Sequence, residues 1–259
     1  MDWMYALAGL IVGAMVGLTG VGGGSLMAPI LILFFGIAPS TAVGTDLWFA
    51  AITKTVGGVV HQQHKGPDWQ IVRRLALGSL PAAALTVMAL SFSGGHQVKS
   101  GTVMHILGAV LLLTAVATLF RKQIHAYATG ARATAVKVHP WQAPATVFAG
   151  VILGVLVTLT SVGSGALGAA MLLLLYPFRL SSRRLVGTDI VHAVPLTFVA
   201  GLGHLWIGNV DFGTLGLLLI GSIPGIIAGS FLANRTSDSV IRPVLAAVLA
   251  FAGYRLLIA

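Results

Sequence analysis

The stretch Thr19-Gly20-Val21-Gly22-Gly23-Gly24-Ser25 interrupts an apolar segment near the start of the chain, and Thr160-Ser161-Val162-Gly163-Ser164-Gly165 interrupts a second one. Each glycine costs a helix about 1 kcal/mol relative to alanine. A broken helix also leaves backbone N–H groups free, and apolar surroundings cannot satisfy them. The two stretches therefore predict two broken helices whose ends are buried inside protein.

The two interruptions belong to a longer internal repeat. Residues 9–28 align with residues 150–169, and 11 of these 20 positions are identical. Further along, the sequence Val-Gly-Thr-Asp occurs at both 43–46 and 186–189. A repeat of this length indicates that the chain consists of two similar structural halves. It divides the chain into an N-terminal transmembrane repeat, a cytoplasmic linker and a C-terminal transmembrane repeat: residues 1–120, 121–141 and 142–259.

The composition places these halves in a membrane. Hydrophobic residues make up 57% of the chain and charged residues 8%, against about 25% charged in soluble domains. Each half contains about five apolar segments. The second segment of each half is short, and ~12 residues reach only ~18 Å of a ~30 Å hydrocarbon core. The expected segments are residues 3–20, 25–36, 42–60, 73–92 and 103–120, then 142–160, 165–177, 185–207, 212–232 and 240–258.

The basic residues predict how the segments cross. If the first two segments of each half form a Gly-broken or re-entrant hairpin, twelve basic residues share one side, and only Lys99 and Arg255 lie on the other. Basic loops face the cytoplasm. We therefore expect an all-α polytopic protein of the bacterial cytoplasmic (inner) membrane, with two inverted-topology repeats and both termini outside. The twelve are Lys65, Arg73, Arg74, Arg121, Lys122, Arg132, Lys137, Arg179, Arg183, Arg184, Arg235 and Arg242.

With its two glycine-rich stretches, the Gly-Thr-Asp motif after each and the layout in two halves, the sequence resembles the sulfite exporter TauE/SafE family, also called the sulfite/organosulfonate transporter family. The resemblance covers essentially the whole chain. It implies a permease for sulfite or an organosulfonate such as sulfoacetate or toluenesulfonate. Composition and spacing by themselves carry no sign of sulfur.

The broken helices suggest where an anion would bind. Two helix N-termini that meet near the membrane midplane offer free N–H groups and favourable dipoles, and neighbouring hydroxyls add donors. Close helix packing through small residues is the alternative interpretation. The candidate substrate-binding residues are Thr19, Gly22, Gly23, Gly24, Ser25, Lys54, Thr160, Ser161, Gly163, Ser164, Gly165 and His192.

Four ionisable residues fall inside apolar segments, where such groups are functional candidates. Asp46 and Asp189 either take up protons as coupling groups or serve as scaffold. Lys54 either contacts the substrate or snorkels or pairs with Asp46. His192 lies in the middle of its segment, where a titratable ring could gate or bind an anion; His61 and His204, at helix ends, are expected at the interface.

The remaining features narrow the function. Pro81 and Pro224 occupy equivalent positions and predict either hinges or fixed kinks.

The absence of cysteine and the histidine spacing predict no metal site, and we expect no cofactor, no nucleic-acid partner and no enzymatic activity. The expected partners are membrane lipid, a small sulfur-containing anion and protons as a coupling ion. We thus predict a secondary transporter that works by alternating access, with an anion channel as the alternative.

Overall fold

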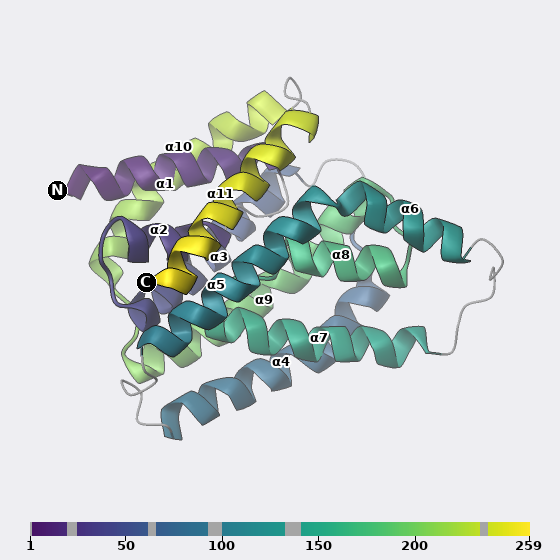
Figure 1. Ribbon diagram of the computed structural model, residues 1–259, viewed down its shortest axis with the longest axis horizontal. Coiled ribbons are helices and arrows are strands. Elements are labelled where there is room, and N and C mark those ends of the chain that lie inside the picture. Colours follow the sequence, from purple (N-terminus) through teal and green to yellow (C-terminus); the bar gives the residue numbers. More distant parts are fainter. Residues whose placement is uncertain (1, 20–24, 62–65, 93–99, 133–140, 234–237) are drawn as a thin grey trace.

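Helices account for nearly all of the chain that the computed structural model describes, namely residues 2–19, 25–61, 66–92, 100–132, 141–233 and 238–259 (Figure 1). Eleven helices occur in these ranges. They are α1 Asp2–Thr19, α2 Met27–Leu33, α3 Pro39–His61, α4 Trp69–Phe92, α5 Ser100–Leu119, α6 Arg121–Arg132, α7 Gln142–Thr160, α8 Ala166–Leu175, α9 Ser182–Ile207, α10 Phe212–Ala233 and α11 Asp238–Ile258.

Six of the described helices are long and apolar enough to cross a membrane: α4, α5, α7, α9, α10 and α11. Among the others, α3 has 23 residues, but it carries polar residues such as Asp46 and Lys54. The short helices α2 and α8 have 7 and 10 residues, which at ~1.5 Å per residue is too little to span the core. The expectation of an all-helical membrane protein is confirmed.

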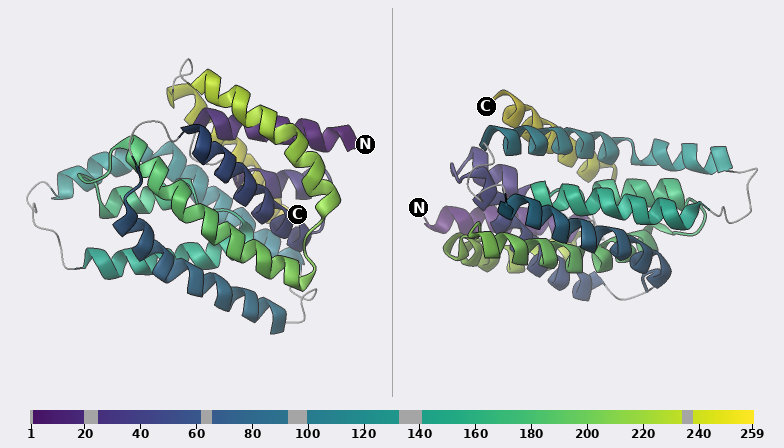
Figure 2. Two further views of the ribbon diagram at one scale, coloured as in Figure 1. Left: turned by 180° about the vertical axis from the view of Figure 1, so that it is seen from behind. Right: turned by 90° about the horizontal axis from the view of Figure 1, so that it is seen from below.

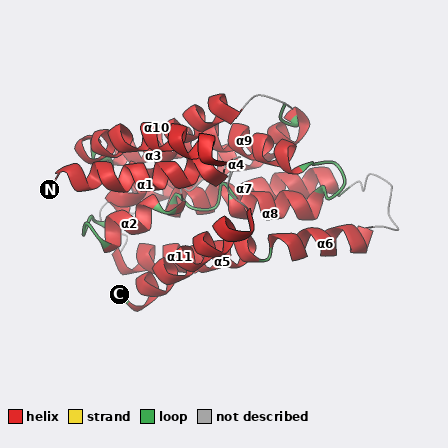
Figure 3. Cartoon of the chain, turned by 90° about the horizontal axis from the view of Figure 1, so that it is seen from above, coloured by secondary structure: helices red, strands yellow, loops and turns green. Residues whose placement is uncertain are grey.

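Helices separated in sequence are arranged in three layers. From behind, α10, α3, α9 and α4 lie side by side in this order (Figure 2), and each packs against its neighbour. The opposite face is made by α5 and α11, which pack against each other (Figure 3). The short helices lie between these layers, because α2 contacts both α3 and α11, and α8 contacts both α9 and α5. The two short helices are therefore enclosed by protein.

Two helix pairs pack so closely that their backbones touch. α1 lies along α10, and α7 lies along α4. A Cβ atom at Gly13 would collide with the backbone of Ser222, and one at Gly154 with the backbone of Ser79. Gly13 and Gly154 are aligned positions of the repeat, and so are Ser222 and Ser79. Small residues that allow this approach are a common basis of helix packing in membranes.

The linker differs from the sequence-based expectation in one respect. Its first part, Arg121–Arg132, forms α6, an amphipathic helix that begins directly after α5 and packs on α8. Both chain termini lie at the same end of the molecule, and α6 extends toward the other end (Figures 1 and 3). Pro81 and Pro224 lie inside α4 and α10, which continue past them; their action as hinges stays a prediction.

The α4–α7 contact gives the first testable prediction. We expect Gly154→Ala to lower the apparent melting temperature of the detergent-purified protein, because the new methyl group must push α7 away from α4, and overpacking of this kind costs ~1–3 kcal/mol. Gly216→Ala in α10 is the matched control, since a Cβ there meets nothing within 4 Å. Equal melting temperatures for the two variants would contradict the packing described here.

Candidate functional site

The second glycine-rich stretch is a sharp break between α7 and α8. Ser161 has φ +59°, Gly163 φ +123° and Gly165 φ +142°, so three of five consecutive residues adopt left-handed backbone conformations. α8 then begins at Ala166, and its N-cap residue, Gly165, provides no side-chain hydrogen bond. The predicted break is thus present. Gly22, Gly23 and Gly24 of the first stretch lie outside the described residues, and so does the side chain of His61.

Lys54 reaches this break from α3. Its side chain is only 4% exposed, and Nζ donates hydrogen bonds to the Ser164 carbonyl oxygen at 2.9 Å and to Ser164 Oγ at 2.6 Å. Among the described residues, no carboxylate lies within 4.0 Å of the ammonium, as an ion pair would require. Lys54 therefore neither snorkels to the surface nor pairs directly with Asp46. Its two hydrogen bonds link the first half of the chain to the break in the second half.

Asp46, two helical turns before Lys54, holds the start of α2. The side chain is fully buried, and Oδ2 accepts a hydrogen bond from the Ala28 backbone N–H at 3.1 Å. The Ser161 hydroxyl lies beside the same carboxyl group without hydrogen-bond geometry, and neither that hydroxyl nor Asp46 Oδ1 has a partner among the described residues. Asp46 thus contacts one break and faces the other.

Asp189 takes the equivalent place in the second half. It is buried in α9, and its Oδ1 lies against Gly168 in the first turn of α8, where an added Cβ would come within 2.6 Å of that oxygen. Asp46 and Asp189 both interact electrostatically with Lys54. The cluster therefore contains one ammonium group facing two carboxyl groups, with a short helix against each carboxyl group.

His192 and His204 form hydrogen bonds to helices outside this cluster. His192 Nε2 lies 2.8 Å from Ser79 Oγ in α4, and His204 Nε2 lies 2.9 Å from the Thr158 carbonyl oxygen in α7. Both rings are buried, and neither Nδ1 atom has a partner among the described residues. The expectation that His204 is interfacial is wrong, because α9 packs on α7 at that level.

The other predicted hydroxyl donors have different surroundings. Thr19 Oγ1 donates to the Met15 carbonyl oxygen at 2.8 Å, and Thr160 Oγ1 donates to the Leu156 carbonyl oxygen at 2.6 Å. These bonds turn both hydroxyls back on their own helices. Ser25 is buried just before α2. The structure thus brings Ser161 and Ser164 together with Lys54 and Asp46, but not Thr19.

Two hydrogen bonds between the halves relate equivalent residues. The Asp211 backbone N–H donates to Thr45 Oγ1 at 3.0 Å, and the Asp68 backbone N–H donates to Thr188 Oγ1 at 2.9 Å. Thr45 corresponds to Thr188 in the repeat, and Asp68 corresponds to Asp211. The repeated Gly-Thr-Asp motif draws attention to these two threonines, but the sequence does not indicate that each of them contacts the opposite half.

Asp68 also forms an ion-paired cluster that its counterpart lacks. Arg179 binds its carboxylate through two hydrogen bonds of 2.7 and 2.9 Å, and Arg184 lies 3.5 Å away. Burial alone would raise the pKa of Asp68, but the hydrogen bonds and charge of Arg179 outweigh it and hold that pKa below 3.8. Asp211 instead caps α10 and accepts from the Gly213 and Thr214 N–H groups at 2.9 and 3.1 Å.

This difference gives a second prediction. The pKa of Asp68 is lower in the folded protein, so the stabilisation is present above pH ~4 and is lost as the pH falls through the folded value. We expect Asp68→Asn to lower the melting temperature at pH 7, with a difference from wild type that shrinks below pH 4. Hydrogen bonds from Thr214 and Gly213 also lower the pKa of Asp211, but asparagine caps helices about as well as aspartate, so Asp211→Asn should lower the melting temperature at pH 7 by less than Asp68→Asn does. Equal effects of the two variants at pH 7 would contradict an ion-pair contribution.

Long apolar helices that enclose broken segments, an ammonium group and two carboxyl groups define a class of protein, the polytopic membrane transporters. A family model described as sulfite exporter TauE/SafE matches residues 5–256. The chain therefore belongs to the sulfite exporter TauE/SafE family.

Individual relatives agree with this assignment. The chain is 39% identical to "Probable membrane transporter protein YjnA" of Bacillus subtilis (strain 168), over 97% of this chain and 98% of that protein. It is 26% identical to "Probable membrane transporter protein YdhB" of the same organism, over 98% and 99%. It is 27% identical to "Probable membrane transporter protein MJ0441" of Methanocaldococcus jannaschii, over 98% and 95%. No solved structure matches it significantly.

Proposed function

We propose that this protein is a secondary transporter for a small sulfur-containing anion, such as sulfite or an organosulfonate, in the bacterial cytoplasmic membrane. The observation that carries the proposal is the buried Lys54 ammonium, bonded to Ser164 at the break before α8. An ammonium group far from water is costly unless a counter-charge compensates it. Asp46 and Asp189 face this ammonium, but neither lies within the 4.0 Å of a direct ion pair, so a bound anion would form the direct ion pair at a point where the two halves meet.

The donors around Lys54 suit a sulfonate or sulfite group, which presents three acceptor oxygens. Lys54 has three N–H donors, and Ser164 accepts from it through two atoms. The Ser161 hydroxyl is buried and has no partner among the described residues. An anion that replaced Ser164 as the acceptor would receive hydrogen bonds from Lys54, Ser164 and Ser161. The sulfur itself is an inference from the family's description.

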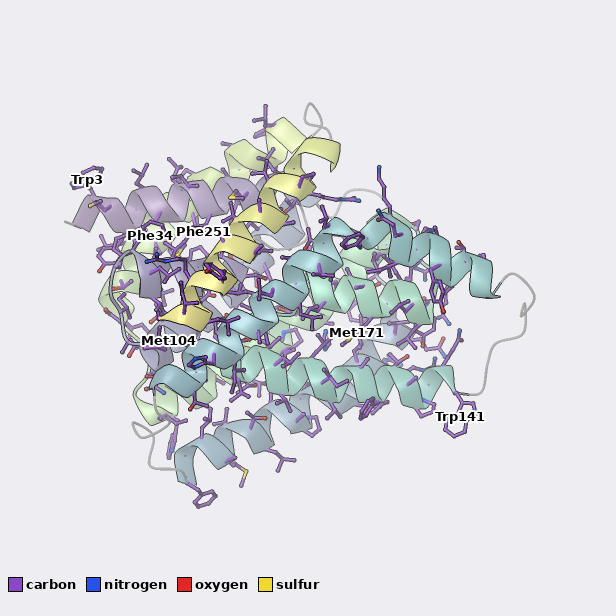
Figure 4. All side chains as sticks on the ribbon, in the orientation of Figure 1. Trp3, Phe34, Met104, Trp141, Met171 and Phe251 are labelled. Carbon is purple, nitrogen blue, oxygen red and sulfur yellow. The ribbon has the colours of Figure 1, made fainter. Side chains whose placement is uncertain are left out.

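Alternating access would follow from an inverted relation between the halves. Equivalent helices start at opposite ends of the molecule, as Trp3 in α1 and Trp141 just before α7 indicate (Figure 4). α1 packs on α10 as α7 packs on α4. The two Thr–Asp hydrogen bonds are also reciprocal. Thr45 of the first half accepts from Asp211 of the second half, and Thr188 of the second half accepts from Asp68 of the first. These observations support inverted repeats, with both termini outside when the basic linker is placed in the cytoplasm.

In this scheme each Thr–Asp contact closes one end of the path to the site. Opening toward one side would break the Thr188–Asp68 bond, and opening toward the other side would break the Thr45–Asp211 bond. Pro81 in α4 and Pro224 in α10 lie in the helices that would have to bend. An anion that leaves alone from a cell with an interior potential of about −100 mV gains ~2.3 kcal/mol, whereas an anion that moves together with a proton transfers no net charge and gains nothing from this potential.

A thermal-shift panel on the detergent-purified protein tests the substrate. The compounds are sulfite, sulfate, thiosulfate, taurine, sulfoacetate, toluenesulfonate, acetate and benzoate. A ligand at 100 times its dissociation constant stabilises the folded state by ~2.7 kcal/mol. We expect shifts with sulfite or sulfonates, their loss in Lys54→Met, and partial retention in Lys54→Arg. Lys122→Met, at an exposed position of α6, is the control that removes a lysine outside the site.

Two results would overturn this proposal. An equal response to the carboxylates would remove the sulfur specificity, and a full response in Lys54→Met would remove the site. Flux measurements in liposomes then separate a transporter from a channel. A transporter gives saturable uptake of labelled anion driven by unlabelled anion inside, whereas a channel gives no such counterflow.

A further inference from the structure

The ionisable groups around Lys54 contain as many carboxyl groups as permanently cationic groups, namely Asp46 and Asp189 against Lys54 and Arg121. Lys54 faces Asp46 on its own helix and Asp189 on α9. Asp189 in turn faces Arg121, the first residue of α6, and His192 also lies within electrostatic range of Lys54. A monovalent anion that binds the Lys54 ammonium adds a negative charge to a site that already holds two carboxyl groups.

The helices packed against α3 offer no other charge near the cluster that could compensate. α2, α7 and α10 contain no ionisable side chain. α1 has Asp2 and Tyr5 in its first turn, and α5 has the exposed His105. α9 carries Arg183 and Arg184 at its start and His204, bonded to Thr158, near its end. The compensating charge must therefore arrive with the anion.

Asp46 is the group best placed to receive it. Its Oδ2 atom is used by the Ala28 N–H, whereas Oδ1 is fully buried and has no hydrogen-bond partner among the described residues. Buried polar atoms without partners are rare in folded proteins. A proton on Oδ1 would give it an O–H bond, which could donate to the neighbouring Ser161 oxygen or to an oxygen of the anion.

We propose that the protein binds a proton together with its anion, the proton on Oδ1 of Asp46 and the anion at the Lys54 ammonium, and that it carries the two as a pair. The proposal rests on the transport function proposed above. The proton joins the carboxylate when the anion enters and leaves it when the anion leaves, and no electrons are transferred. The net charge of the site is then the same when empty and when loaded. The empty protein and the loaded protein can therefore both change between the states open to either side of the membrane, without an added charge in the apolar core.

The test uses toluenesulfonate, because this anion of a strong acid does not itself carry protons at neutral pH. Protein is reconstituted in liposomes that contain a pH-sensitive dye, and the membrane potential is clamped at zero with potassium and valinomycin. Counterflow of labelled toluenesulfonate measures transport. An inward gradient of the anion should acidify the lumen, with one proton entering for each anion.

Two substitutions assign the proton. We expect Asp46→Asn to abolish acidification while counterflow persists at a reduced rate, because the neutral amide resembles the protonated carboxyl group. Asp189→Asn should still acidify the lumen. Lys122→Met, at an exposed position of α6 outside the site, should leave both signals as in wild type.

Binding measurements cover the case in which Asp46→Asn does not fold. Calorimetry of toluenesulfonate binding to the wild type, in two buffers of different ionisation enthalpy, should give uptake of one proton per anion. Counterflow without acidification, or binding without proton uptake, would overturn the coupling and leave the transport function standing. Acidification that survives Asp46→Asn would overturn the assignment to Asp46. Absence of both counterflow and binding would overturn the coupling and the proposed function together.

Discussion

The structure depends on how two broken helices are accommodated inside a bundle that faces lipid. A helix end exposes backbone N–H groups, and lipid offers them no partner. α2 and α8 are therefore enclosed between the α3/α9 layer and the α5/α11 layer. Carboxyl groups from α3 and α9 lie against their first turns, with Asp46 on Ala28 and Asp189 against Gly168. The burial of these charges follows from the burial of the helix ends.

The packing of the helices is repeated in the two halves, whereas the side chains of the site are not. Helix pairs, glycine contacts and Thr–Asp bonds occur at equivalent positions in both halves. Lys54, however, corresponds to Thr197, and Ser164 corresponds to Gly23. In the proposed mechanism, a symmetric frame suits a protein with two similar orientations, whereas a single ammonium group would provide one place for one anion. The donor and its acceptor each come from one half, so the site is complete only where the halves meet.

The two ends of the molecule are also unequal. Arg179 and Arg184 bind Asp68 at one end, whereas the corresponding positions Gly36 and Thr41 carry no charge. Tyr176 adds to this end, because its hydroxyl accepts from Arg74 at 3.0 Å and lies 2.7 Å from Thr146 Oγ1. Basic residues gather on the cytoplasmic side of membrane proteins. Arg179 and Arg184, which the sequence predicts to lie in the cytoplasm, therefore also stabilise one end of the contact between the halves.

By itself, the sequence determined the membrane class, the sequence repeat, the approximate positions of the described helices other than α6 and the break at 161–165, because long apolar runs and glycine clusters act locally. It also singled out Asp46, Lys54 and Asp189, since charge is rare in such runs. Only the tertiary structure decided their partners. The bond from Lys54 to Ser164 joins residues 110 positions apart, and the burial of His204 depends on the packing of α9 against α7. Such contacts depend on which helix faces cross, and segments that are apolar all round do not encode the facing side in their own pattern.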